Sequence, residues 1–217
     1  MFALDVWLRF GVYDAGGARV PGLPEWPPEP ARVFCALVAG DPDESQWRAL
    51  RWLEGQGVPE VHCPAANDST TPEMFVITNE TKASSPLRPG RKADKRVKPS
   101  SFPDGSRFSI VWPHAEPDEA TFDALCRLAR LVPYVGRSSA QAVVEARTTS
   151  ADANWVGPGA QVYEPVDIGL GTADLGVPYP GYCDALESAY RDGRRAWEER
   201  RSVEYAVRTD GTPRLEP

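Results

Sequence analysis

The sequence predicts a single α+β domain whose elements follow the order strand, helix, strand, strand, helix, strand. Three observations support this prediction: segments in which apolar and polar residues alternate, segments with apolar residues at helical spacing, and a basic, proline-rich stretch between the second and third strands. A chain of 217 residues suits one large domain, or a smaller one with an appendage. Its hydrophobic content of 41% is enough for a packed core.

The first predicted element is a half-buried strand at residues 2–13. Leu4, Val6 and Leu8 occupy every second position, with mostly polar residues between them, which is the pattern of a strand with one face in the core. Glycines and four prolines then fill residues 15–28, so we expect a loop there.

The first helical region is predicted at residues 31–54. Pro30 suits the first turn of a helix, and the apolar residues that follow it recur at helical spacing. Asp41 and Pro42 restart the chain, after which apolar residues again recur at helical spacing until Gly55 ends the region.

Three further strands and a second helix complete the pattern. The strands are expected at residues 58–63, 107–112 and 140–146, and the helix at residues 117–131. This order predicts a ferredoxin-like sandwich, in which two helices cover one face of an antiparallel four-stranded sheet. The same frame is found in RNA-recognition domains.

The chain is therefore divided into two parts. Residues 1–150 form the predicted sandwich, with residues 64–106 inserted as a long arm between the second and third strands. Residues 151–217 form a C-terminal extension, expected to be coil apart from a helix at 180–193 and a possible strand at 202–207.

Positive charge is concentrated in the inserted arm. The whole chain has a net charge of −7, yet Lys82 to Arg107 contains eight Lys and Arg residues against two Asp residues. This segment therefore carries +6 and the rest of the chain −13. A basic segment on an acidic body predicts a local nucleic-acid contact, and the alternative is a solvated, mobile loop. The candidate RNA-binding residues of this segment are Arg88, Arg91, Lys92, Lys95, Arg96, Lys98 and Arg107.

A second candidate RNA contact is the turn after the second helix, formed by Gly136, Arg137, Ser138 and Ser139. Glycine permits close backbone approach, hydroxyl and N–H groups can donate to phosphate oxygens, and arginine offers a forked donor. The alternative is an ordinary turn that ends a helix. Three aromatic residues in or beside the arm could stack on bases, although we expect at most one or two of them to do so: Phe75, Phe102 and Trp112.

The sequence contains no convincing catalytic or metal site. The four cysteines form no C-x-x-C pair, and the known phosphate-binding, zinc-protease and hydrolase motifs are missing. We therefore expect no metal and no cofactor. A metal-independent ribonuclease would need a general base, for which only His62 and His114 are available, and both are expected to be structural or incidental.

No stretch of the sequence is long and apolar enough to cross a membrane. The first residues include Asp5 and Arg9, where a signal peptide would be apolar. We expect a cytoplasmic protein with no membrane contact.

Four stretches resemble one protein family, in the same order along the chain. Residues 25–37, E-W-P-P-E-P-A-R-V-F-C-A-L, are similar to the W-P-P-x-P-x-R-x-F-x-A-L stretch of the fused Cas-five/Cas-six subunit of type I-G (formerly I-U) CRISPR effector complexes. The other similar stretches are 75–80, 136–139 and 179–195. The first and last are specific motifs.

The resemblance implies a repeat-associated RNA-binding fold that caps the 5′ handle of the CRISPR RNA in a Cascade complex, where a thumb hairpin grips the handle. The implied partners are the CRISPR RNA, the backbone (Cas-seven-type) and large subunits, and possibly target DNA. The fused family continues into a half that cuts precursor RNA, whereas this sequence stops at Pro217. We therefore expect a non-catalytic subunit. The alternatives are a metal-independent endoribonuclease that processes precursor CRISPR RNA, or a protein-interaction module.

Overall fold

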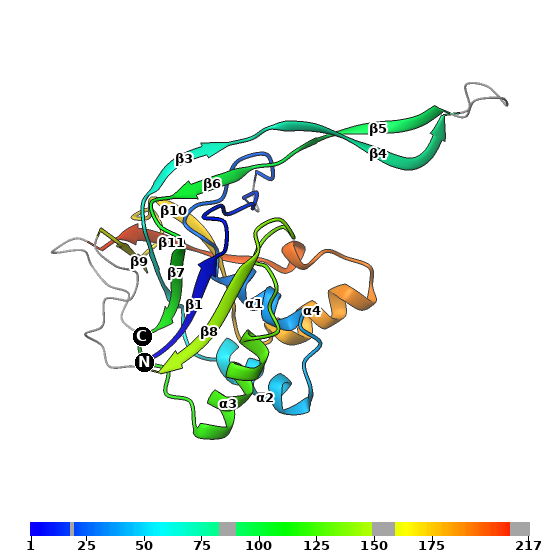
Figure 1. The fold of residues 1–217 in the computed structure, drawn as a ribbon. Helices are drawn as coiled ribbons and strands as arrows, with labels where there is room; N and C mark the ends of the chain where they lie inside the picture. Colours follow the sequence, from blue (N-terminus) through cyan, green and yellow to red (C-terminus); the bar gives the residue numbers. More distant parts are fainter. Residues whose placement is uncertain (18–19, 83–89, 149–158, 209–217) are drawn as a thin grey trace.

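The computed structural model describes residues 1–17, 20–82, 90–148 and 159–208, with side chains except at 78–82 and 90–92 (Figure 1). The helices are α1 (Pro30–Val38), α2 (Glu44–Glu54), α3 (Glu119–Ala129), α4 (Tyr182–Arg191) and the short 3-10 helix η1 (Ala196–Glu199). The strands are β1 (Phe2–Leu8), β2 (Glu60–Cys63), β3 (Ala66–Thr70), β4 (Glu73–Lys82), β5 (Gly90–Val97), β6 (Ser100–Pro103), β7 (Arg107–Trp112), β8 (Ala142–Thr148), β9 (Gln161–Pro165), β10 (Ala173–Val177) and β11 (Arg201–Val207).

The body of the protein is built on a seven-stranded sheet with the order β10-β11-β9-β2-β7-β1-β8. Every neighbouring pair in this sheet is antiparallel. The register is set on β1, where Leu4 lies opposite Ile110 of β7 and Ala146 of β8. The α+β class and the antiparallel sheet predicted from the sequence are confirmed.

The core lies between the sheet and the helices, which gather on one side of it in Figure 1. β1 is buried on both faces, so the prediction of a half-buried strand is wrong. Phe2, Leu4 and Val6, at alternate positions, pack with apolar residues of the helices, such as Phe34 of α1 and Leu125 of α3. Burial of this continuous apolar layer is the main term that stabilises the body.

The predicted helical region 31–54 forms two helices because the chain turns at Asp41 and Pro42. Asp41 has a positive φ of 57°, and proline cannot continue the helical hydrogen bonds. The second helix then begins at a capping box, in which the Asp43 side chain accepts from the backbone N–H of Gln46 and the Gln46 side chain accepts from the backbone of Asp43.

The first strand is shorter than the predicted 2–13. It ends at Leu8 because Gly11, with φ 63°, turns the chain, and the Gly11 N–H donates to the Leu8 carbonyl oxygen at 3.2 Å. Tyr13 then forms an isolated bridge with Ser101, which belongs to β6 at the base of the inserted arm. The end of the predicted strand therefore pairs with the arm.

The coil predicted between residue 151 and the helix at 180–193 is wrong from residue 161 onward. It contains β9 and β10, while the predicted helix at 180–193 and strand at 202–207 are found as α4 and β11. β9 pairs with β2, and β11 joins β9 to β10. These strands cover the edge of β2, which would be open in a four-stranded sheet.

Arg107, a predicted RNA contact, takes part in a buried polar cluster on the sheet. Asp5 of β1 is 2% exposed. Its carboxylate accepts from the Ser109 hydroxyl at 2.5 Å, and from the guanidinium groups of Arg107 and Arg147 at 2.8 Å each. The Arg107 guanidinium also lies 4.7 Å from the centre of the Trp7 ring. These contacts tie β1 to both of its neighbours.

Replacement of Asp5 by alanine is expected to lower the free energy of unfolding by about 3 to 5 kcal/mol, because it leaves two arginines without their buried partner. Urea unfolding monitored by circular dichroism measures the loss. The control is Asp167→Ala, which removes an exposed acid from a loop and should change the free energy by no more than about 0.5 kcal/mol. Equal values for the two variants would contradict the structural role of Asp5.

Candidate nucleic-acid interface

The predicted arm forms a long two-stranded ribbon that projects away from the body (Figure 1). β3 pairs with β6 near the body, and β4 pairs with β5 farther out, both antiparallel. Along the outer part, Met74 lies opposite Arg96 and Phe75 lies opposite Lys95. Residues 83–89, between β4 and β5, lie outside the described residues.

The base of the ribbon is fixed by the loop that follows β1. Tyr13 and Ser101 exchange two backbone hydrogen bonds of 2.9 Å each. The Ser101 hydroxyl donates to the carbonyl oxygen of Glu25 at 3.1 Å, and the Thr71 hydroxyl donates to the carbonyl oxygen of Gly22 at 3.2 Å. Both strands of the ribbon are therefore anchored to the body. An isolated two-stranded hairpin would lack these stabilising contacts.

Asp14 is the centre of this anchor. Its side chain is 3% exposed and its carboxylate accepts from the Lys98 ammonium at 2.8 Å and from the Ser100 hydroxyl at 2.5 Å. Burial raises the pKa of Asp14, but hydrogen bonds from Lys98, Ser100 and Ser139 outweigh it and hold the pKa below its ordinary value. The carboxylate is therefore ionised and bound at neutral pH.

The predicted turn at residues 136–139 meets the ribbon at the same residue. The Ser139 side chain contributes a hydrogen bond to the Asp14 carboxylate, and the Arg137 backbone N–H donates to the Asp14 carbonyl oxygen at 2.9 Å. Gly136 has φ 94°, and a Cβ atom there would lie 2.8 Å from that carbonyl oxygen, so glycine is required. The side chains of Arg137 and Ser138 face solvent.

The two groups of residues predicted separately, on the ribbon and in the turn, thus lie together around one carboxylate. Asp14 itself was not predicted. It follows the first strand in a glycine-rich loop, and no motif or spacing distinguishes it from an ordinary loop aspartate.

The predicted cations fall into two groups. Lys98 and Arg107 pair with the buried carboxylates of Asp14 and Asp5 and so support the structure. Lys95 and Arg96 are well exposed: the Lys95 ammonium lies 2.6 Å from Glu73, and the Arg96 guanidinium lies 3.9 Å from Asp94. Such exposed pairs are weak and exchange readily for a phosphate.

The remaining cations cannot be placed in full. Arg91 and Lys92 belong to β5, but their side chains are not described. Arg88 lies outside the described residues.

Next to the exposed cations, β4 presents four consecutive exposed apolar side chains: Met74, Phe75, Val76 and Ile77. Phe75 is 73% exposed. Of the other aromatic candidates, Trp112 is buried in the core and Phe102 is half-buried. The sequence pattern identified this segment as a strand, but only the ribbon, which has no core on either face, leaves all four side chains exposed.

Neither histidine shows the geometry of an exposed general base with a partner. The His62 ring nitrogen Nε2 lies 2.8 Å from Glu60, and both side chains are largely buried. Burial raises the pKa of Glu60, but His62 and Arg208 outweigh it and hold that pKa below its ordinary value. His114 is exposed in the turn after β7.

The described residues contain no group of three or more His, Cys, Asp or Glu residues arranged to hold a metal ion. Within the same part of the chain, each helix is too short or too polar to cross a membrane.

Comparison with known protein families found no family that matches the chain, and comparison with curated proteins found no matching relative. The geometry and charge of the ribbon are therefore the features from which a function can be inferred.

Replacement of Asp14 by alanine is expected to loosen the base of the ribbon, because Lys98 and Ser100 lose their shared partner. Hydrogen–deuterium exchange at pH 7 should show faster exchange of the amides of Lys98, Ser100 and Ser101, with the free energy of unfolding lowered by about 3 kcal/mol. Because the folded pKa of Asp14 is lowered, this stabilisation is present above about pH 5 and is lost as pH falls through the lowered pKa.

The matched control is Asp104→Ala, which removes an exposed acid at the base of the same ribbon. Its exchange rates should equal those of the unmodified protein. If Asp14→Ala exchanged no faster than Asp104→Ala at residues 98–101, the anchoring role of Asp14 would be wrong.

Proposed function

We propose that this protein is a non-catalytic RNA-binding subunit of a type I CRISPR interference complex, in which the ribbon holds the 5′ handle of the CRISPR RNA. The observation that carries the proposal is a projecting ribbon on which exposed cations and exposed apolar side chains lie side by side, attached to an acidic body. Phosphates and unstacked bases are the two chemical groups that such a surface would bind.

The arrangement of the central strands supports the finer fold that the proposal requires. A ferredoxin-like sandwich places its four strands in the spatial order fourth, first, third, second. The strands β8, β1, β7 and β2 are the fourth, first, third and second strands of the predicted pattern, and they are neighbours in this order. The ribbon is inserted into this core between β2 and β7. We compare it with the inserted thumb hairpin of the family that the sequence resembles.

The distribution of charge supports binding at the ribbon. The chain outside Lys82 to Arg107 carries a net −13, so a polyanion is repelled by most of the body. Lys95 and Arg96 on the ribbon and Arg137 in the turn at its base are exposed. They are therefore the cations to which we expect a polyanion to bind.

The apolar side chains of β4 favour a single strand over a duplex. Bases in a duplex are stacked on one another, whereas an unpaired base can stack on an aromatic ring. Phe75 lies directly opposite Lys95, so one nucleotide could place its base on the ring and its phosphate near the ammonium group. The resemblance supplies the identity of the strand, the repeat-derived handle.

Reversal of the two exposed ribbon cations, Lys95→Glu with Arg96→Glu, is expected to weaken RNA binding at least about 100-fold at 50 mM salt, because it replaces two attractions by two repulsions. The probe is a fluorescein-labelled single-stranded RNA with the 5′ handle of the cognate repeat, measured by fluorescence anisotropy. The slope of log K against log salt should also fall in magnitude by about 1.4, since each lost contact removes about 0.7.

The matched control is Arg48→Glu with Arg130→Glu, an equal change of charge at exposed positions on the helical side. It should weaken binding far less, and by a similar factor for any RNA. Equal losses in the two double variants would refute binding at the ribbon. Cleavage of the probe by the unmodified protein in EDTA would favour the endoribonuclease alternative.

Replacement of Phe75 by alanine is expected to weaken the same RNA about tenfold, because stacking of a base on an aromatic ring contributes about 1 to 3 kcal/mol. The loss should be independent of salt concentration. Phe10→Ala is the matched control, since Phe10 is 68% exposed but lies outside the ribbon. A Phe75 variant that binds as tightly as the Phe10 variant would show that no base stacks there.

A further inference from the structure

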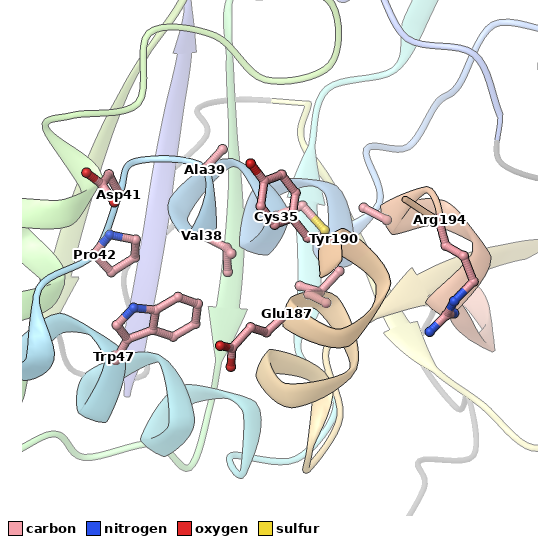
Figure 2. Close-up of a pocket in the computed structure, with 11 residues that line it drawn as sticks. Cys35, Val38, Ala39, Asp41, Pro42, Trp47, Glu187, Tyr190 and Arg194 are labelled. Atoms are coloured by element: carbon pink, nitrogen blue, oxygen red, sulfur yellow. The ribbon is translucent and has the colours of Figure 1, made fainter. Parts of the chain in front are cut away.

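A groove on the helical side of the protein is separate from the ribbon. It lies between α1, the turn after it, α2 and α4, and has a volume of about 510 Å³ (Figure 2). Val38, Pro42, Trp47 and Leu186 supply most of its apolar lining, and Tyr190 stands at its rim. This groove is not used by the proposed RNA contact.

The groove continues along the outer face of α1. Two smaller hollows adjoin it and share its residues: Cys35 lines all three, and Ala39 lines the first and the third. The floor is made of small side chains, with Ala36 and Gly40 beside the shared residues. An elongated depression with a floor of small residues suits a polypeptide segment better than a compact small molecule.

Large aromatic residues are exposed around this depression. Tyr190 is 85% exposed, Trp197 is 63% exposed and Tyr134 is 40% exposed. Each lines one of the three hollows. Exposed tyrosine and tryptophan around a groove are typical of protein-binding surfaces, because they bury much area at small cost in conformational entropy.

The groove also carries negative charge. Asp41 and Glu187 line it, and Figure 2 shows the Glu187 carboxylate beside the Trp47 ring. Glu187 has one partner, the exposed Arg191 at 3.0 Å, while Asp41 has no ion-pair partner among the described residues. The one cation in the lining, Arg194, pairs with Glu199 and Asp192 and is already neutralised.

The Trp47 ring is suited to a guanidinium group. Arg51 of the same helix already lies 5.8 Å from its centre, which shows that a cation is tolerated beside this ring. An arginine from outside would find the Trp47 ring and the Glu187 carboxylate together, while Asp41, on the other side of the ring, adds to the negative charge of the groove.

The residues that line the groove indicate which secondary structure a bound polypeptide would have. The groove is lined by helices and the turns between them, so there is no strand edge to pair with an extended peptide. A helical segment satisfies its own backbone hydrogen bonds and needs only side-chain contacts.

We propose that this groove docks an amphipathic helix of a partner protein, anchored by an arginine on its apolar face. The arginine binds to Glu187 over Trp47 and is also attracted by Asp41, and apolar side chains of the helix fill the depression along α1. The arginine site shares no residue with the RNA contact, although the third hollow reaches Gly136 in the turn at the base of the ribbon, so either assignment can fail without the other.

The test uses the full chain and two synthetic helical peptides of about 14 residues, alanine-based, with leucines at i and i+4 and an arginine at i+7. The second peptide carries citrulline, a neutral analogue, in place of the arginine. Fluorescence anisotropy of the labelled peptides should show binding of the arginine peptide at least about tenfold tighter than that of the citrulline peptide, since a charge-assisted contact is lost.

Three variants locate the site. Asp41→Asn, which keeps a side chain that tolerates positive φ, and Glu187→Gln should each weaken the arginine peptide without changing the citrulline peptide. Tyr190→Ala should weaken both peptides. Glu44→Gln removes an exposed acid of α2 outside the groove and should change neither. All four variants should bind the handle RNA as the unmodified protein does.

The proposal is overturned if the two peptides bind equally, if Asp41→Asn or Glu187→Gln leaves the arginine peptide unaffected, or if the arginine peptide does not bind at 1 mM, about the weakest affinity of interest. Loss of RNA binding in the groove variants would instead place the RNA on this face and refute the separation of the two sites.

Discussion

The buried carboxylate of Asp14 determines how the ribbon is presented. A ribbon of two strands has no interior, and its direction must be set where it leaves the body. Lys98 and Ser100 from the ribbon and Ser139 from the turn after α3 all bind this carboxylate. One ionised group thus fixes the ribbon to the loop after β1 and to the second predicted RNA contact.

Buried acids paired with cations recur in the body and connect segments distant in sequence. Glu29, at the start of α1, binds Arg200 at 3.0 Å, and Asp5 in the central strand binds Arg107 and Arg147. These pairs explain how an acidic chain folds without concentrated repulsion in its interior. The arginines in these pairs are neutralised by their partners. The exposed cations of the ribbon therefore differ in charge from the body, which is negative overall.

Much of the fold could be predicted because the signals are local. Alternation along β1 and β7 and helical spacing in α1 to α3 depend only on neighbouring residues, and they also defined the strand that becomes β11. β9 and β10 gave no such signal, since each has five residues and lies beside proline or glycine. They are strands because the edge of β2 and then β11 offer hydrogen bonds, which is a property of the assembled sheet.

The distribution of charged residues along the sequence was enough to locate the basic arm. The difference in net charge between two segments depends on their composition and not on how they fold. Which cations are available was decided by the tertiary structure: Lys98 and Lys95 are three residues apart, yet one binds a buried acid and the other faces solvent. The groove along α1 likewise arises only when helices from both ends of the chain pack together. By itself the sequence determined the class of fold, the order of its elements and the site of positive charge, whereas packing decided which side chains remain free to bind, because burial depends on contacts between distant segments.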